Sequence, residues 1–152
     1  MISGGQIYHL TNFQQSDNSQ PKNRYCVVLA VIADDSVIIF HKVTSVPYCD
    51  DQLEKGGNTV NEKMDVFFFP KDWVIGVNGF QFSQDSYIHM GVWNISEMTI
   101  EKFQAFEHEY LDTLTSDVYN ELLYFVYKSE HNRQKFEVVF EPILEKLNSG
   151  DS

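Results

Sequence analysis

The sequence predicts an α+β fold, in which a small, strongly bent antiparallel sheet closed toward a barrel precedes C-terminal helices. Short segments rich in β-branched and aromatic residues fill the chain up to residue 96, and a helical period of apolar residues follows Thr99. With 152 residues, 43% of them hydrophobic, the chain is long enough to bury one core. We expect a single domain over 1–152, mainly β in 1–96 and helical in 97–148.

Two long apolar segments mark the centre of the predicted sheet. Arg24–Ile32 and Val37–Val43 are dense in Val and Ile, and an acidic turn of residues 33–36 joins them. Such continuous apolar strands are buried on both faces, and β-branched side chains favour extended backbone. These two strands should therefore form a central antiparallel hairpin.

Shorter segments and turn signals outline the rest of the sheet. The Asn78–Gly79 dipeptide is the sharpest hairpin signal in the chain. The polar stretches Thr11–Asn23 and Val46–Asn58 lack an apolar pattern, so we expect loops there. Further strands are expected at Gln6–Leu10, Met64–Phe69, Trp73–Val77, Phe80–Phe82 and Tyr87–Trp93.

Three helices are predicted after the sheet. Thr99 can cap a short helix, and Ser116–Asp117 can open a second one. The third helix contains Pro142, which should kink it or make it restart, and a strand at Lys135–Phe140 is the alternative. The apolar stripes comprise Ile100, Phe103 and Phe106; Val118, Leu122, Phe125 and Val126; and Phe136, Val139, Phe140, Ile143, Leu144 and Leu147.

Composition and charge exclude several classes of protein. The apolar runs are far shorter than the roughly 20 residues of a membrane-spanning helix, and the N-terminus lacks the features of an export signal. We therefore expect no membrane partner and a cytoplasmic location. Cys26 and Cys49 form no paired motif and should be free thiols. The net charge of −11 opposes a surface broadly attractive to nucleic acid.

Polar side chains gather at the open end of the central hairpin. In a tight hairpin the start of the first strand lies beside the end of the second, which brings Arg24 near Lys42, Thr44 and Ser45. A guanidinium can donate two hydrogen bonds to one phosphate, and a hydroxyl can add a third. The alternatives are an Arg24 paired with a carboxylate, hydroxyls that only close a turn, and a solvated Lys42 at a strand edge.

Other chemistry has little support in the sequence. The five histidines are scattered without metal-binding spacing, so we expect neither a metal site nor a cofactor. His108 is expected on a solvated helix face. Asp34–Asp35 and Asp50–Asp51 are neighbours in turns, where alternating directions separate their carboxylates.

The arrangement of three motifs resembles the PemK/MazF-like toxins. Gly5–Tyr8 stands where that family begins its first strand, Lys22–Leu29 is similar to its Arg-Pro-hydrophobic strand, and Val43–Ser45 is similar to its Thr-Ser ending of the next strand. The related ToxN-like nucleases, which also carry C-terminal helices, are a close second. In this chain Gln6 replaces the usual Asp and Tyr25 the usual Pro.

The resemblance implies a metal-independent endoribonuclease on an SH3-like barrel. Arg24 would be the principal catalytic residue and Thr44 or Ser45 its partner, cleaving single-stranded RNA to a cyclic phosphate and a free 5′-hydroxyl. Lys22, Tyr25 and Lys42 would contact the substrate, with the Tyr25 ring able to stack on a base. A small antitoxin and a homodimer are the partners that the family implies.

Two further functions stay open at this stage. A non-catalytic barrel could bind a protein partner through aromatic anchors, for which Tyr48, Phe68, Trp73 and Phe82 are the candidates. An acidic immunity or antitoxin-like protein could instead neutralise a basic partner by charge complementarity.

Overall fold

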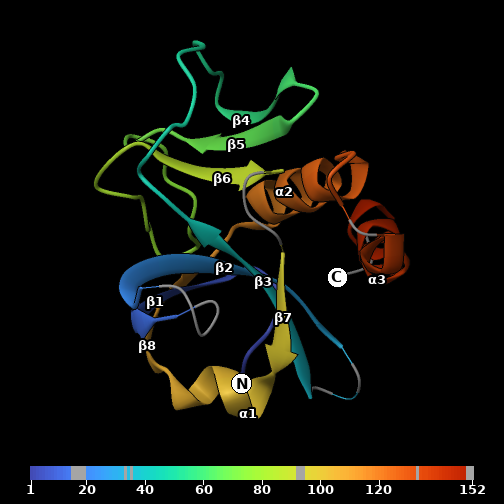
Figure 1. Ribbon diagram of the computed structural model, residues 1–152. Helices are drawn as coiled ribbons and strands as arrows, with labels where there is room; N and C mark the ends of the chain where they lie inside the picture. Colours follow the sequence, from blue (N-terminus) through green and yellow to red (C-terminus); the bar gives the residue numbers. More distant parts are fainter. Residues whose placement is uncertain (15–19, 33, 35, 92–94, 133, 150–152) are drawn as a thin grey trace.

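The computed structural model describes residues 1–14, 20–32, 34, 36–91, 95–132 and 134–149. The described residues form eight strands and three helices (Figure 1). In chain order these are β1 (Gln6–Phe13), β2 (Lys22–Ile32), β3 (Val37–Val43), β4 (Gly56–Asn61), β5 (Met64–Phe69), β6 (Ser86–Met90), β7 (Ser96–Thr99), α1 (Ile100–Ala105), β8 (Glu107–Thr113), α2 (Ser116–Lys128) and α3 (Gln134–Asn148).

The strands form two antiparallel sheets, which confirms the α+β class. The first sheet has the order β7-β3-β2-β1-β8, so the two long apolar strands lie inside it, as predicted. The second sheet has the order β4-β5-β6 and lies above the first in Figure 1. A bridge between Thr44, just after β3, and Tyr87 of β6 joins the two sheets.

The sheets do not close into a barrel over the described residues. β7 and β8 remain the edges of the first sheet, and β4 is an edge of the second. The predicted closure fails because the sheets meet through the single Thr44–Tyr87 bridge rather than through a continuous strand pair. The result is a bent pair of open sheets.

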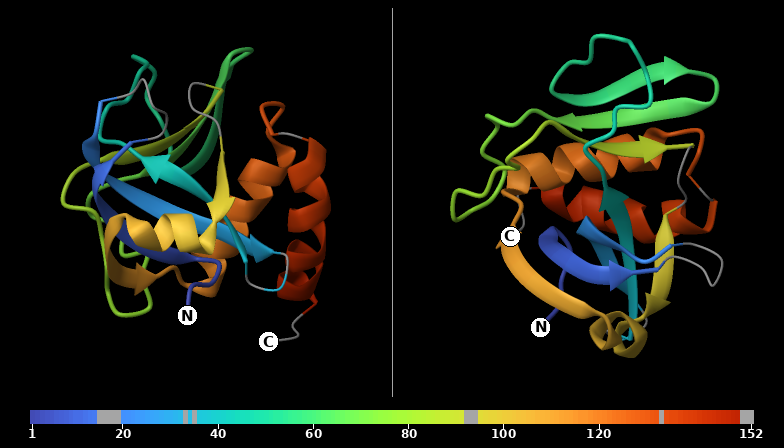
Figure 2. Two further views of the ribbon diagram at one scale, coloured as in Figure 1. Left: turned by 60° about the horizontal axis from the view of Figure 1, so that its bottom comes forward. Right: turned by 60° about the vertical axis from the view of Figure 1, so that its left-hand side comes forward.

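The main hydrophobic core lies between both sheets and the last two helices. Val27 and Leu29 of β2 and Phe67 of β5 contribute to it from the sheets. Leu122 of α2 and Phe140 of α3 close it from the other side, and Figure 2 shows these two helices side by side. Burying such large side chains is the principal source of stability.

A second core covers the opposite face of the first sheet. Cys26, Val28 and Phe40 point into it, and Phe103 of α1 closes it. Thr99 caps α1 as predicted, because its side chain accepts a hydrogen bond of 3.1 Å from the Lys102 backbone N–H. Cys26 and Cys49 are free thiols, and burial raises the pKa of Cys26 above its ordinary value.

The predicted strands at Val37–Val43 and Met64–Phe69 are confirmed with their predicted bounds. The first strand runs on to Phe13, and β2 begins at Lys22, so the expected loop between them is shorter; its residues 15–19 lie outside the described part. β6 ends at Met90, and residues 92 and 93, the last two of the predicted strand Tyr87–Trp93, also lie outside the described part. Of the turn at 33–36, residues 33 and 35 are not described.

The predicted strands Trp73–Val77 and Phe80–Phe82 are wrong, although the chain does turn between them. The Gly79 backbone N–H donates to the Gly76 carbonyl at 3.0 Å, which closes the turn. The carboxylate of Asp112 in β8 accepts backbone hydrogen bonds from Asn78 and Phe80. A side chain 32 residues away therefore satisfies backbone groups that a sheet would otherwise pair.

The segment 97–148, predicted to be helical, contains the three helices but also strand residues. β7 overlaps the start of this segment and β8 lies within it, so His108 belongs to a strand rather than to a helix. Both are edge strands, and the first four residues of β8 are exposed, so the sequence of neither strand shows an apolar pattern. β4 (Gly56–Asn61) was missed for the same reason, because its residues up to Asn58 were expected to belong to a loop.

The last two helices confirm their predicted apolar stripes. Thr115, one residue before the predicted start, caps α2. Pro142 lies inside α3, which continues through it, so neither the restart nor the strand at Lys135–Phe140 occurs. The proline removes a hydrogen bond to the carbonyl of Val138, whose side chain is 73% exposed, so this turn faces solvent.

Candidate functional site

The pairing of β2 with β3 brings the predicted site residues together. Tyr25 lies opposite Val43 and Cys26 opposite Lys42, so Arg24 lies beside Thr44 at the open end of the hairpin. Side chains alternate along a strand, and paired residues share a face. Arg24, Lys42 and Thr44 therefore project from one face, and Tyr25 and Val43 from the other.

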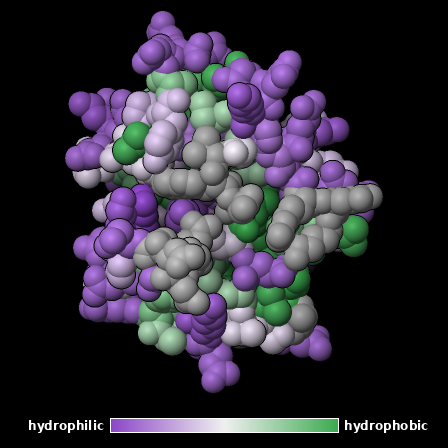
Figure 3. Space-filling view, in the orientation of Figure 1, coloured by the Kyte–Doolittle hydropathy of each residue, from purple (hydrophilic) through white to green (hydrophobic). Residues whose placement is uncertain are grey.

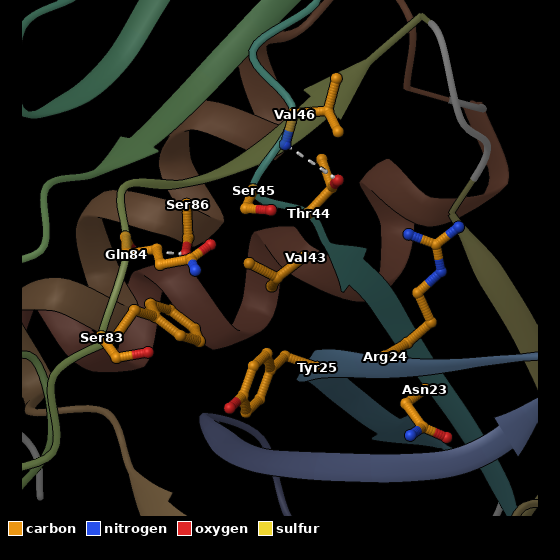
Figure 4. A pocket seen from close by; sticks show the side chains of 11 residues that line it. Asn23, Arg24, Tyr25, Val43, Thr44, Ser45, Val46, Ser83, Gln84 and Ser86 are labelled. Atoms are coloured by element: carbon orange, nitrogen blue, oxygen red, sulfur yellow. Dashed lines mark hydrogen bonds between the residues drawn. The ribbon is translucent and has the colours of Figure 1, made fainter.

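A cavity of about 350 Å³ opens at this end of the hairpin, where the two sheets meet (Figure 4). Arg24 and Thr44 lie on the same side of it, and Ser83, Gln84 and Ser86 lie on the opposite side. The described lining residues are Asn23, Arg24, Tyr25, Val43, Thr44, Ser45, Val46, Phe82, Ser83, Gln84 and Ser86. All three residues predicted to be catalytic thus line one cavity.

Thr44 is buried and rigidly held. Its backbone exchanges hydrogen bonds with Tyr87, and its Oγ1 accepts one of 3.2 Å from the Val46 backbone N–H. The turn that we considered as an alternative role is therefore present. It uses the hydroxyl as an acceptor, which leaves the O–H proton to be donated to a ligand.

The polar wall opposite Arg24 was not predicted. Ser83 and Gln84 belong to the connection between β5 and β6, and Ser86 is the first residue of β6. The Ser86 hydroxyl donates to the Gln84 carbonyl at 2.9 Å, which orders this wall. The sequence signal was a short polar run after Phe82, but its approach to the hairpin depends on the Thr44–Tyr87 bridge between the sheets.

The Tyr25 ring forms part of the cavity wall and is 38% exposed. It makes edge contacts with Phe82 and with His9, at centroid distances of 5.3 and 5.1 Å. These contacts on two sides fix the ring orientation while leaving part of it open to solvent. The ring is therefore available for a flat ligand at the cavity mouth.

Lys42 is close enough to both Arg24 and Lys22 to interact with them electrostatically. Lys42 is buried, and this burial, followed by the charges of Arg24 and Lys22, lowers its pKa to about 8. It is thus not the solvated strand-edge lysine of the alternative. Neither lysine is among the described residues that line the cavity, so their effect on a ligand there acts through the electrostatic field.

The cavity contrasts in charge with the rest of the molecule. The chain has a net charge of −11, and hydrophilic side chains cover much of the face in Figure 3, most densely over the β4–β5 end at the top. Arg24 is nevertheless the single charged residue among the described residues of the cavity lining. An anion in the cavity would therefore contact a guanidinium, hydroxyls and amides but no carboxylate of that lining.

Two other findings concern the described part of the chain. No group of three or more His, Cys, Asp or Glu side chains is arranged there to hold a metal ion. None of the helices in this part is both long and apolar enough to cross a membrane.

Comparison of this chain with protein-family models, with curated proteins and with solved structures finds no match.

Proposed function

We propose that the protein is an endoribonuclease of the PemK/MazF kind, which cleaves single-stranded RNA without a metal ion. The observation that carries this proposal is that Arg24, Thr44 and Ser45 line one cavity of about 350 Å³. Their side chains supply one cation and two hydroxyls, a donor set suited to a phosphodiester.

The chemistry assigned to these residues follows from where charge develops. The ribose 2′-hydroxyl gives its proton to water as its oxygen attacks phosphorus, the bond to the 5′-oxygen breaks, and that oxygen takes up a proton from water, so the products are a cyclic phosphate and a 5′-hydroxyl. Arg24 stabilises the negative charge of the phosphorane and donates a hydrogen bond to the leaving oxygen. Thr44, held in place by Tyr87 and Val46, donates to a phosphate oxygen, with Ser45 beside it at the exposed rim.

The acidity of the chain does not oppose this assignment at the cavity itself. Lys42, which interacts with both Arg24 and Lys22, adds positive charge near Arg24, and the opposite wall offers only hydroxyl and amide groups among the described lining residues. Repulsion between the remaining acidic surface and RNA should make binding weak at low salt compared with basic nucleases.

The SH3-like architecture and the partners belong to the same proposal. The sheet bends from β3 through the Thr44–Tyr87 bridge into β6, which is compatible with an SH3-like barrel opened along one side. A small antitoxin and a homodimer are the partners we propose, on the resemblance of Lys22–Leu29 and Val43–Ser45 to the family.

The test is incubation of the purified protein with single-stranded RNA in EDTA. We expect cleavage, products with 5′-hydroxyl and cyclic phosphate ends, and no cleavage of an oligonucleotide whose nucleotides are all 2′-deoxy. Cleavage that needs a divalent metal, or that proceeds on the 2′-deoxy oligonucleotide, would refute the mechanism. Binding of a protein partner without any RNA cleavage would favour the interaction module instead.

A further inference from the structure

An exposed tyrosine, Tyr48, follows Val46, which lines the cavity, by two residues along the chain. Val46 lies at the top of the cavity in Figure 4 and Tyr25 near its lower end. The chain continues from Val46 to Tyr48, whose side chain is 48% exposed. Tyr48 has a φ of +57°, a left-handed conformation that is unusual for a bulky residue. Such backbone conformations persist only where the surroundings enforce them, and they are concentrated at binding sites.

The second sheet fixes the position of the Tyr48 ring. Its edge contacts the ring of His89 in β6, at a centroid distance of 4.7 Å. His89 is buried and stacks on Tyr87 at 5.6 Å, and Tyr87 stacks on Phe68 at 5.2 Å. These four rings form an aromatic row that includes the half-exposed Tyr48.

A hydrogen bond ties the same row to the cavity wall. The His89 Nε2 lies 2.7 Å from the Val46 carbonyl oxygen, and Val46 also donates its backbone N–H to Thr44. Burial lowers the pKa of His89, although this hydrogen bond opposes the shift, so the ring is neutral and donates from Nε2. The segment from Thr44 to Tyr48 is thus held against β6 at both ends.

A ring that is exposed and already immobilised is suited to stacking on a base. Base stacking is tolerant of sequence, and a fixed ring loses little conformational freedom when a ligand binds. Along a single strand, bases lie on both sides of each phosphate. A phosphate at Arg24 and Thr44 would therefore place one neighbouring base toward Tyr25 and the other toward Tyr48.

We propose that Tyr48 is a base-stacking subsite for the nucleotide on the far side of the scissile phosphate from Tyr25. His89 is the positioning residue that holds it there. The proposal rests on the proposed function for the identity of the ligand as single-stranded RNA. It adds that the enzyme requires an unpaired base at this position, because a base within a duplex cannot stack on a protein ring.

The first test measures the affinity of the full chain for an RNA oligonucleotide made uncleavable by 2′-deoxy substitution at the scissile nucleotide. We expect Tyr48→Ala to weaken binding roughly 5- to 100-fold, and Tyr48→Phe to bind within about twofold of wild type. Tyr110→Ala is the matched control, since Tyr110 is also 48% exposed but lies in β8, and it should leave affinity unchanged. Thermal unfolding of each variant verifies that it is folded.

A second arm replaces one base at a time in the oligonucleotide by an abasic site. One abasic position should weaken wild-type binding by the same factor as Tyr48→Ala, and should weaken the Tyr48→Ala variant no further. Equal affinity of wild type and Tyr48→Ala at every position would overturn the proposal and leave Tyr48 as an anchor for a protein partner.

Cleavage of all-ribose RNA separates this proposal from the proposed function. If wild type cleaves RNA and Tyr48→Ala has an unchanged KM, the stacking subsite is wrong and the nuclease stands. If wild type binds RNA in a Tyr48-dependent way but does not cleave it, the subsite stands and the nuclease is wrong.

Discussion

Thr44 and Tyr87 exchange two backbone hydrogen bonds, from Thr44 N to Tyr87 O at 3.0 Å and from Tyr87 N to Thr44 O at 2.7 Å. This pair is the junction of the two sheets, and the same threonine lines the cavity. The cavity therefore forms where backbone hydrogen bonds join the two sheets, and the Thr44 hydroxyl cannot move independently of the fold.

Thr44→Val should separate the chemical role of the hydroxyl from its structural one. The variant keeps the backbone bridge to Tyr87 and loses only the 3.2 Å hydrogen bond from Val46, so the free energy of unfolding should fall by about 1 kcal/mol or less. RNA cleavage should fall about 100-fold or more, the usual cost of removing one transition-state donor. Thr44→Ser, which keeps the hydroxyl, should retain most of the activity, and equal losses in Ser and Val variants would contradict this role.

Asp112→Ala should destabilise the chain by about 1–3 kcal/mol in urea unfolding, because it removes the buried acceptor of the hydrogen bonds donated by the Asn78 and Phe80 backbone N–H groups. Burial by itself raises the pKa of Asp112, but hydrogen bonds from Thr113, Phe80 and Asn78 outweigh it, and the pKa lies below its ordinary value. The contribution is therefore present above about pH 4 and lost as pH falls further. A variant whose acid unfolding matches that of wild type would contradict this account.

Lys42→Met should change how stability depends on alkaline pH. The pKa of Lys42 is about 8 in the folded chain against an ordinary 10.5, so between these values the unfolded chain holds a proton that the folded chain has released. The free energy of unfolding of wild type should accordingly rise with pH across this window relative to that of Lys42→Met. Below pH 8 the difference between the two proteins should not change with pH. Urea unfolding from pH 7 to 10 measures this, with the exposed Lys71→Met as control.

His89→Phe should remove an acid sensitivity near neutral pH. The pKa of His89 lies below its ordinary 6.5 because it is buried, so the unfolded chain takes up a proton first as pH falls. Wild-type stability should be complete above about pH 6.5 and decrease below it, whereas His89→Phe should lack this component. The variant also loses the bond to the Val46 carbonyl, costing about 1 kcal/mol at pH 7.5. Identical pH profiles of the melting temperature would contradict the burial of a neutral His89.

The central hairpin could be predicted from sequence because its signals are local. Val37–Val43 is dense in β-branched residues, so its pairing with β2 was correctly predicted. The turn alone does not set the register at the open end, because a shift between Val28 and Ala30 moves the pairing by one residue and places Arg24 beside Thr44. Edge strands lack such signals: β4 and β8 are largely polar and exposed, and only their pairing with β5 and β1 makes them strands.

Long-range contacts account for the other differences. The stretch from Trp73 to Phe82 has the composition of a hairpin, but hydrogen bonds to Asp112 hold it as an irregular turn. Gln84 and Ser86 reach the site only because the second sheet docks on Thr44. No pattern in the neighbouring residues encodes that docking.

The most direct test of the nuclease assignment is the single-turnover rate of RNA cleavage in EDTA by wild type, Arg24→Lys and Arg24→Ala. Arg24→Ala should be slower by roughly 100- to 1,000-fold. Arg24→Lys should recover only a small part of the rate, because an ammonium cannot donate two hydrogen bonds in the planar geometry of a guanidinium. Arg24→Ala that is folded and cleaves at the wild-type rate would contradict the assignment.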